Sequence, residues 1–486
     1  MNQIASQLDP VAPLPAPSIR SAVTTTKSLA VVNVVGLTPE LLGQHTPNIN
    51  ALANKGEMLP MEGVFPAVTT TAQATMVTGK MPNEHGIVGN GWYFKDLAEV
   101  KFWLQPNSIV QGNKVWDDLK ARNPEFSCSK LFWWYNMYAN VDNAITPRPH
   151  YPADGRKIMG LYSEPAMLHE NIESDIGTFP FFNFWGPNAD IRSSRWIVDC
   201  AIAEFQLNRP NLQLVYLPHL DYNLQRLGPS HPDVTEDIKQ IDTEVGRLLD
   251  FYQAHDVDVV LVSEYGIEPV KQSVSLNRIL RQAGYLRVRE SVSWELLDCG
   301  ASRAFAVADH QIAHVYVQNS SDVAKVKALL QKQPGVEQVL DKSEQAAWHI
   351  NHERSGELVV IAEPECWFDY YYWLDDVKAP DFARSVDIHR KPGYDPVELF
   401  VDPELRFPML KIGQRLIQKK LGMRMLMDVI PLDTSLVKGS HGRLASSADK
   451  GPLIITSSSQ LLDGLSTYSS FAMAQVNTLL QTHFTS

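Results

Sequence analysis

The sequence predicts an α/β fold with a mainly parallel central sheet, helices on both faces of that sheet, and a small inserted α+β cap. Near-continuous apolar runs, typical of strands buried on both faces, occupy Leu29–Leu37, Leu212–Asp221 and Val257–Gly266. Between the second and third runs, the stretch DVTEDIKQIDTEVGRLLDFYQAHD carries apolar residues at helical spacing. Strand–helix–strand units build parallel sheets, and such sheets bind ligands beyond the carboxyl ends of their strands.

The first elements follow from the pattern near the N-terminus. Residues 1–27 are rich in Pro, Ala and Ser, and we expect them to form a flexible arm ahead of the fold. The first strand opens into a loop at Gly36, and TPNINALANKGE then predicts a short amphipathic helix that ends at Gly56. The block from Phe65 to Asn90 has turn residues at both ends and a centre compatible with a helix.

A different pattern occupies residues 300–365. Short strands are predicted at AHVYVQ, VEQVLD and ELVVIAE, with a helix at SDVAKVKALLQKQ after the first of them. The polar loop DIHRKPGYDPVELF and the helix MLKIGQRLIQKKL come later. We therefore divide the chain into the arm at 1–27, a core at 28–295, an inserted cap with its ligand-rich loop at 296–405, and the rest of the core at 406–486.

The charge balance excludes one class of partner. The chain has 486 residues, with 43 Lys and Arg against 55 Asp and Glu, which gives a net charge of −12. Nucleic-acid-binding proteins concentrate positive charge, so we expect no nucleic-acid partner. An anionic substrate would need a metal ion or backbone donors to reverse the local field.

Cysteine content and hydropathy indicate the cellular compartment of the protein. The four cysteines are scattered without a CxxC pair, which suits a reducing environment. No stretch approaches the apolar length that a membrane span requires, and the N-terminus lacks the basic start and apolar core of a secretory signal. We therefore expect a cytoplasmic protein with no membrane partner; the oligomeric state does not follow from the sequence.

A series of motifs spans most of the chain, from about residue 28 to residue 460. In order, they are a strand ending in Gly, PN-x-x-x-L, FP-x-x-T, VTG-x-x-P-x-x-HGI, a strand ending in Asp, a strand ending in an acidic–aromatic–Gly triplet, and GSHG. This order resembles the type I phosphodiesterase/nucleotide pyrophosphatase branch of the alkaline phosphatase superfamily. Within it, the chain is most similar to a bacterial subgroup with the phrases NGWYF, LFWWYNMY, YLPHLDYNLQRLGP and HRKPGYDP. The resemblance implies an alkaline-phosphatase-like fold and a hydrolase that acts on a small phosphate ester.

The resemblance also implies a nucleophile. In the family, a Thr or Ser at a helix N-terminus attacks phosphorus, and water then hydrolyses the phospho-enzyme. The matching residue is Thr69 in FPAVTTT, with Thr70 and Thr71 as close competitors. A metal ion or a base must activate the hydroxyl, and the helix N-terminus favours an anion. The alternative is that the three threonines cap a helix and carry no chemistry.

The resemblance implies two zinc ions, which clamp the attacking and leaving oxygens, but only part of the ligand set is present. Asp221 and His441 match family ligands, and Glu264 replaces an aspartate. Three further positions depart from the family's ligands and hold Val35, Gln225 and Tyr265. Two certain donors cannot hold an intact pair of zinc ions. We therefore expect a divalent metal, zinc by the resemblance, with one ion favoured over two and a metal-free site as the remaining option.

Neighbouring residues offer a way to rebuild a metal site. His219 precedes Asp221 by two residues, so both side chains would point the same way on an extended strand. Other Asp and His pairs are Asp387 with His389 and Asp309 with His310. We hypothesise a single relocated site in which Asp221 and His441 are joined by His219 or by the pair in the ligand-rich loop. The alternative is that these histidines only hold loops in place.

Arginine could take over part of the missing metal charge, because its planar fork matches a phosphate group. Arg148 and Arg390 are the candidates, and solvated loop charges are the alternative. Two aromatic clusters, Phe132–Tyr135 and Tyr370–Trp373, would either line a pocket or pack the cap against the core.

The favoured function is hydrolysis of a phosphate ester by in-line attack of Thr69, assisted by a divalent metal. The main alternative is a pseudoenzyme that binds a phosphorylated or aromatic metabolite without hydrolysing it, because half of the matched metal ligands are replaced. A third option is group transfer from a bound intermediate with one metal ion or none.

Overall fold

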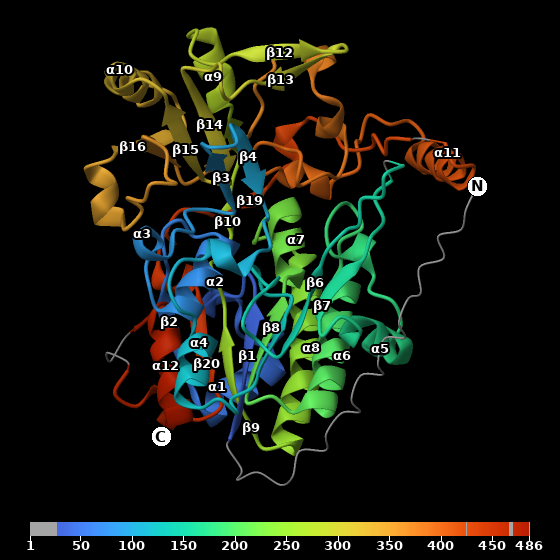
Figure 1. Cartoon of the computed structure of the whole chain (residues 1–486), viewed down its shortest axis with the longest axis vertical. Helices are drawn as coiled ribbons and strands as arrows, with labels where there is room; N and C mark the ends of the chain where they lie inside the picture. The colour runs from blue at the N-terminus through green and yellow to red at the C-terminus, as the bar shows by residue number, and fades with distance from the viewer. Residues whose placement is uncertain (1–26, 155, 424, 466–469, 486) are drawn as a thin grey trace, which may run out of the picture.

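The computed structural model describes residues 27–154, 156–423, 425–465 and 470–485. Residues 1–26 of the expected N-terminal arm lie outside these ranges. Figure 1 shows a large sheet with its helices in the lower part of the molecule and a smaller group of strands in the upper part.

The large sheet has nine strands, of which the inner five are parallel. Its order is β21 (Phe471–Ala472), β2 (Glu57–Glu62), β20 (Leu453–Thr456), β9 (Val257–Val262), β1 (Ser28–Val34), β8 (Leu212–Leu217), β5 (Cys128–Leu131), β6 (Asn143–Pro147) and β7 (Leu161–Glu164). The strands from β9 to β6 run parallel, and β20 and β7 flank them in the antiparallel sense. Val31 of β1 pairs with Leu214 of β8 and with Val260 of β9, and all three are fully buried. The predicted α/β fold with a mainly parallel central sheet is confirmed.

The helices of this part pack in two groups, on opposite sides of the sheet (Figure 1). One group consists of α1 (Pro47–Lys55), α5 (Leu168–Ile176), α6 (Ile191–Asn208), α7 (His219–Leu227) and α8 (Val234–Ala254). The other consists of α2 (Thr69–Thr78), α3 (Pro82–His85), α4 (Val115–Arg122) and α12 (Gln475–Thr485). The helices predicted after the first strand and between the second and third runs are therefore confirmed as α1 and α8.

The second apolar run is shorter as a strand than the sequence suggested. β8 ends at Leu217, Pro218 takes a non-extended conformation, and α7 begins at His219. The pattern HLDYNLQRL has polar and apolar residues at helical spacing, and this local pattern prevails over the apolar run before it. The prediction that His219 and Asp221 lie on one side of an extended strand is therefore wrong, because both belong to a helix.

A four-stranded antiparallel sheet forms the upper part of the molecule. Its order is β14 (Ala304–Asp309), β15 (Ile312–Val317), β17 (Leu358–Ala362) and β16 (Val336–Asp341), with α10 (Ser320–Leu330) between β15 and β16. The predicted strand–helix–strand–strand order is confirmed, and β14 is an additional strand.

Four short strand pairs lie outside the two larger sheets in the part of the chain that the structure describes. They are β3 (Gly91–Phe94) with β4 (Glu99–Phe102), β10 (Glu268–Pro269) with β19 (Gly439–Ser440), β11 (Gln272–Val274) with β18 (Cys366–Phe368), and β12 (Val288–Ser291) with β13 (Trp294–Leu297). The remaining helices are α9 (Leu276–Gln282) and α11 (Pro408–Lys420), and α11 confirms the helix predicted after the ligand-rich loop. The pairing of β10 with β19 brings the segment before His441 beside the segment that follows Tyr265.

The upper part has a hydrophobic core of its own, and one aromatic cluster belongs to it. Tyr370, Tyr371, Tyr372 and Trp373 are each at most 2% exposed and pack with the strands of the four-stranded sheet. This aromatic cluster therefore packs in the protein interior and does not line a pocket. In the cluster Phe132–Tyr135, Phe132 and Trp133 pack in the core of the large sheet, whereas Trp134 faces a cavity described below.

A buried lysine holds the ligand-rich loop against the fold. The Lys391 side chain is 1% exposed, and its Nζ lies 2.7 Å from Asp395 Oδ2 and 2.6 Å from Glu398 Oε1. Glu398 also accepts hydrogen bonds from the indole of Trp185 at 2.6 Å and from the backbone N–H of Asp387 at 2.9 Å. This network fixes residues 386–399, which form one wall of the cavity.

We expect Lys391→Met to destabilise the protein strongly. The substitution leaves two buried carboxylates without a counter-ion, and breaking a buried ion pair in this way costs about 3–5 kcal/mol. The thermal unfolding midpoint measures the loss. The matched control is Lys378→Met, which removes a half-buried lysine 3.2 Å from Glu290 and should leave the midpoint almost unchanged. Equal midpoints for the two variants would contradict the anchoring role of Lys391.

Candidate active site

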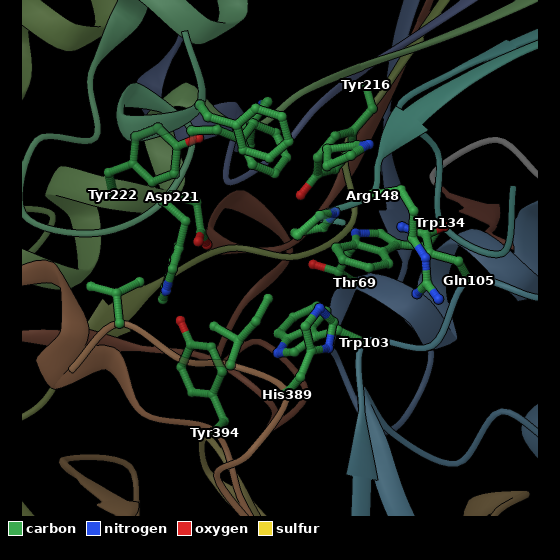
Figure 2. Close-up of a pocket in the computed structure, with 18 of the residues that line it drawn as sticks. Thr69, Trp103, Gln105, Trp134, Arg148, Tyr216, Asp221, Tyr222, His389 and Tyr394 are labelled. Carbon is green, nitrogen blue, oxygen red and sulfur yellow. The ribbon is translucent and has the colours of Figure 1, made fainter. Parts of the chain in front are cut away.

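A cavity opens at the carboxyl ends of the parallel strands, where sheets of this kind bind ligands (Figure 2). It is lined by Tyr216 near the end of β8, Tyr265 after β9 and Thr69 at the first position of α2. Figure 2 shows Thr69, Asp221 and Tyr394 turned toward the same space. The two parallel strands and one helix N-terminus therefore position the polar groups of the site.

Of the three consecutive threonines, only Thr69 presents its hydroxyl to the cavity. Thr70 Oγ1 donates to the carbonyl of Gly89 at 2.8 Å, and Thr71 Oγ1 donates to the carbonyl of Ile87 at 3.1 Å. Thr69 Oγ1 instead lies 3.0 Å from Tyr265 Oη. The hydroxyls of Thr70 and Thr71 thus bind the loop after α3. Because of its orientation on the helix, Thr69 is the candidate nucleophile among the three threonines.

A chain of hydrogen bonds runs from Thr69 into the protein. Tyr265 Oη donates to Asp221 Oδ1 at 3.2 Å, so the hydroxyl of Thr69 is left to donate to Tyr265 Oη. Asp221 Oδ2 accepts from Gln225 Nε2 at 2.7 Å, and Gln225 Oε1 accepts from Tyr394 Oη at 2.9 Å. Burial raises the pKa of Asp221 to about 7, although these donors oppose the shift. The carboxyl group can therefore accept or release a proton near neutral pH.

Glu264 is held by amide groups through one of its two carboxyl oxygens, and Oε2 is buried without a hydrogen-bond partner among the described residues. Its Oε1 accepts from Asn33 Nδ2 at 2.6 Å and from Gln73 Nε2 at 2.7 Å. The residue is fully buried, and burial raises the pKa of its carboxyl group to about 8. Burial thus disfavours the charged form of this group, whereas the amide hydrogen bonds oppose the shift.

Two histidines complete the inner part of the site. His441 Nδ1 donates to the carbonyl of Ala67 at 2.8 Å, which leaves Nε2 as an unprotonated acceptor, buried and without a hydrogen-bond partner among the described residues. Its ring lies between those of Tyr265 and His310, with centroids 3.7 Å away on each side. Burial and the neighbouring His310 lower the pKa of His441 well below its ordinary value. His310 is in turn fixed by Asp309 Oδ1 at 2.8 Å.

The outer part of the cavity is aromatic and carries positive charge. Trp103 and Trp134 pack with ring centroids 4.8 Å apart, and both line the cavity. Arg148, Lys157 and His389 line it as well. Arg390 does not: it is exposed, and its Nε lies 3.3 Å from Asp387 Oδ2. Of the two predicted phosphate-binding arginines, the structure therefore places only Arg148 at the cavity.

The structure does not assemble the predicted relocated metal site. His219 is buried away from the cavity, with Nε2 3.2 Å from Asp237 Oδ1 of α8, and Asp387 pairs with Lys157 and Arg390. Asp221 and His441 do lie together, with Oδ1 and Nε2 3.9 Å apart. Within the described ranges, no three His, Cys, Asp or Glu side chains are grouped so that they could hold a metal ion.

Sequence comparison identifies the family. The model of type I phosphodiesterase / nucleotide pyrophosphatase matches residues 29–395. The chain belongs to this family. An uncharacterized pyrophosphatase/phosphodiesterase of Schizosaccharomyces pombe is 25% identical over 238 residues, which cover 47% of this chain and 42% of the yeast protein. Ectonucleotide pyrophosphatase/phosphodiesterase family member 7 of Homo sapiens is 23% identical over 277 residues, 56% of this chain and 54% of the human protein. The chain therefore spans about half the length of these curated relatives.

Solved structures with the same fold cover nearly the whole chain. Murine ectonucleotide pyrophosphatase/phosphodiesterase 5, solved as an inactive variant with AMP, has a TM-score of 0.57 and 14% identity over 94% of this chain and 95% of its own. Phosphonoacetate hydrolase from Sinorhizobium meliloti 1021, solved with phosphonoformate, has a TM-score of 0.59 and 13% identity over 94% and 96% of the two chains. At these identities the match establishes the phosphodiesterase/pyrophosphatase fold.

The family generally depends on metal ions, zinc in most cases, but the residues of this member do not fit a zinc centre. Zinc needs three or four N, S or O donors in an open arrangement. Here Gln225 presents its amide N–H to Asp221, a phenol lies beside Asp221, and fully buried Val35 replaces a further carboxylate. The chain thus belongs to the type I phosphodiesterase family, but the residues at its site are connected by hydrogen bonds and are not arranged as metal ligands.

From the sequence alone, Gln225 and Tyr265 are positions where a metal ligand of the family is replaced, and no pattern identifies Tyr394 as a site residue. Their role depends on partners that are remote in the chain: Gln225 meets Tyr394 across 169 positions, and Tyr265 meets Thr69 across 196. The phrases YLPHLDYNLQRLGP and HRKPGYDP contain two of these residues, but nothing in either phrase shows that the two side chains meet.

We expect the substitution Gln225→His to create a zinc site. An imidazole at this position would join Asp221 and His441, whose donor atoms are already 3.9 Å apart, as a third ligand. Wild-type protein dialysed against zinc and then buffer should retain no stoichiometric metal by mass spectrometry, and chelator should leave its unfolding midpoint unchanged. Gln225→Asn is the matched control and should behave like the wild type. Stoichiometric zinc in the wild type would overturn the description of the site.

Proposed function

We propose that this protein cleaves a phosphate ester by attack of the Thr69 hydroxyl on phosphorus, with Tyr265 and Asp221 receiving the hydroxyl proton. The observation that carries the proposal is the continuous contact of Thr69 Oγ1 with Tyr265 Oη at 3.0 Å and of Tyr265 Oη with Asp221 Oδ1 at 3.2 Å. A weakly nucleophilic hydroxyl needs an adjacent base, and this chain supplies one. Family membership supports the reaction class.

The proton follows a simple path in this proposal. As Thr69 Oγ1 forms a bond to phosphorus, its proton passes to Tyr265 Oη, and the phenol proton passes to the carboxylate of Asp221. The P–O bond to the leaving group breaks on the opposite side of the phosphorus atom, and the alkoxide or phosphate departs with the electron pair. Water then hydrolyses the phosphothreonine, one water proton restores the Thr69 hydroxyl, and the proton held by Asp221 passes back through solvent to the departed oxyanion. Because the donor set does not fit zinc, no step is assigned to a metal ion.

Several groups support the binding of the phosphoryl oxygens. Thr69 begins a helix of ten residues, whose first N–H groups lack intrahelical partners and whose dipole favours an anion. Arg148 and Lys157 add positive charge at the cavity. The raised pKa of Glu264 reduces the opposing negative charge. The aromatic walls favour an ester that carries a ring, in line with the AMP bound by the murine relative.

A second candidate is a protein that binds such an ester without turnover. The replacement of three family ligand positions by Val35, Gln225 and Tyr265 favours it, since paired metal ions supply much of the charge stabilisation in phosphoryl transfer. Both candidates use the same cavity. They differ in whether Thr69 forms a covalent bond.

We expect turnover of an aryl phosphodiester in the presence of chelator, and its loss in Thr69→Val. The matched control is Thr71→Val, which removes a neighbouring hydroxyl that faces away from the cavity and should keep its activity. Tyr265→Phe breaks the proton path and should lower kcat by about 10²-fold or more, the usual contribution of a positioned base. Initial rates with the product aryl alcohol as readout measure all three.

Three outcomes would each contradict a part of this proposal. Activity that survives in Thr69→Val would exclude this residue as the nucleophile. No turnover by the wild type, together with ligand-induced stabilisation by an aryl phosphate, would establish the binding protein instead. Activity that appears only with added zinc would contradict the metal-free proton path.

A further inference from the structure

Helix α11 and the residues around it expose a continuous set of large apolar side chains. The exposed fractions are 63% for Phe407, 77% for Met409, 73% for Leu410, 61% for Ile417 and 71% for Leu421. In Figure 1, α11 lies at the outer edge of the molecule, away from the large sheet. Single exposed apolar residues are ordinary, but a group of this size marks a contact surface.

The helix has its polar side turned toward the protein. Lys411 Nζ lies 3.0 Å from Asp428 Oδ2, and Arg415 Nη2 lies 2.9 Å from Asp428 Oδ1. Ile412 packs against a small buried cluster that includes Ile430. The outward stripe repeats at helical spacing through Met409, Leu416 and their neighbours, so the apolar face is the one directed to solvent.

The same segment is basic within an acidic chain. Residues 406–427 contain no Asp or Glu, whereas the whole chain carries a net charge of −12. The basic residues of the segment are Arg406, Lys411, Arg415, Lys419, Lys420 and Arg424. Lys420 lies on the exposed face, between the apolar side chains of that face. Apolar residues flanked by Lys and Arg are the composition of a helix that lies in the headgroup region of an anionic bilayer.

We propose that α11, with its flanking residues Phe407 and Leu421, docks on the surface of an anionic lipid bilayer. The apolar stripe enters the boundary between headgroups and acyl chains, and the exposed side chains of Arg406 and Lys420 reach the lipid phosphates. The proposal does not depend on the reaction proposed for the cavity. It revises the expectation of no membrane partner, which rested on the lack of a spanning segment.

Charge complementarity selects a lipid surface over a second copy of the chain. A symmetric dimer in which the stripe packs against its own copy would bring the exposed Arg406 and Lys420 of both copies together, and residues 406–427 contain no acidic residue to neutralise them. An anionic bilayer offers both an apolar layer and negative charge. No helix in the described ranges has the length and apolar character to cross a bilayer, and a helix that lies flat needs neither.

Flotation of the full chain with vesicles tests the proposal. We expect binding to vesicles of equal parts phosphatidylcholine and phosphatidylglycerol, much weaker binding to phosphatidylcholine alone, and release by high salt. The double variant Leu410→Gln/Ile417→Gln should bind the anionic vesicles at least about tenfold more weakly, because it removes two inserted side chains. Lys420→Glu should weaken binding to anionic vesicles while binding to phosphatidylcholine stays the same.

The matched control changes exposed apolar residues elsewhere. Leu97 and Val292 are 59% and 91% exposed and lie far from α11 in the sequence, so Leu97→Gln/Val292→Gln should bind vesicles like the wild type. Unchanged unfolding midpoints show that each variant is folded. Absence of wild-type binding to anionic vesicles would overturn the proposal. So would a wild-type dimer in light scattering that Leu410→Gln/Ile417→Gln converts to a monomer, because the stripe would then belong to a second copy.

Discussion

The buried carboxyl group of Asp221 is the constraint on which the rest of the site depends. A carboxylate removed from water is unstable unless it gains a cation, hydrogen-bond donors or a proton. In this chain it receives a phenol from Tyr265 at 3.2 Å and an amide from Gln225 at 2.7 Å, and burial raises its pKa to about 7. Glu264 meets the same constraint with two amide donors and a pKa raised to about 8. Side-chain donors and protons thus stabilise carboxyl groups that metal ions stabilise elsewhere in the family.

The departures from the family's ligands are consistent with one another. A glutamine at position 225 can serve Asp221 because Tyr394 satisfies the amide oxygen at 2.9 Å. Tyr394 lies in the loop that the buried Lys391 holds against the fold, so the donor set depends on an ion-pair network outside the cavity. Val35 is fully buried in the core of the large sheet, and an aspartate there would add a further carboxylate with no cation to balance it. The replacements at Gln225 and Tyr265 therefore belong to one hydrogen-bonded network around Asp221.

The sequence predicted the sheet well because its inner strands are buried on both faces, and such strands leave long apolar runs. It extended the second run too far, since an apolar run does not show where a helix such as α7 takes over at His219. The FP-x-x-T block placed Thr69 at the cavity, but the choice among three threonines needed the orientation of α2. The contact of Gln225 with Tyr394 joins distant segments, and a single sequence holds no signal for such a pair. The sequence shows that metal ligands are absent at Gln225 and Tyr265. Only the structure shows the hydrogen bonds that these two residues make instead.

The distribution of charge links the cavity to the rest of the molecule. A net charge of −12 would repel a phosphate ester if the acidic groups nearest to Thr69 were ionised. Burial raises the pKa values of Asp221, Glu264 and Asp309 together, so the innermost part of the site carries less negative charge than its composition suggests. Arg148 lines the same cavity, and less negative charge opposes it there than three ordinary carboxylates would supply. Desolvation of the carboxyl groups, which raises their pKa values, thus also lowers the repulsion that this acidic protein would exert on the anion of the proposed reaction.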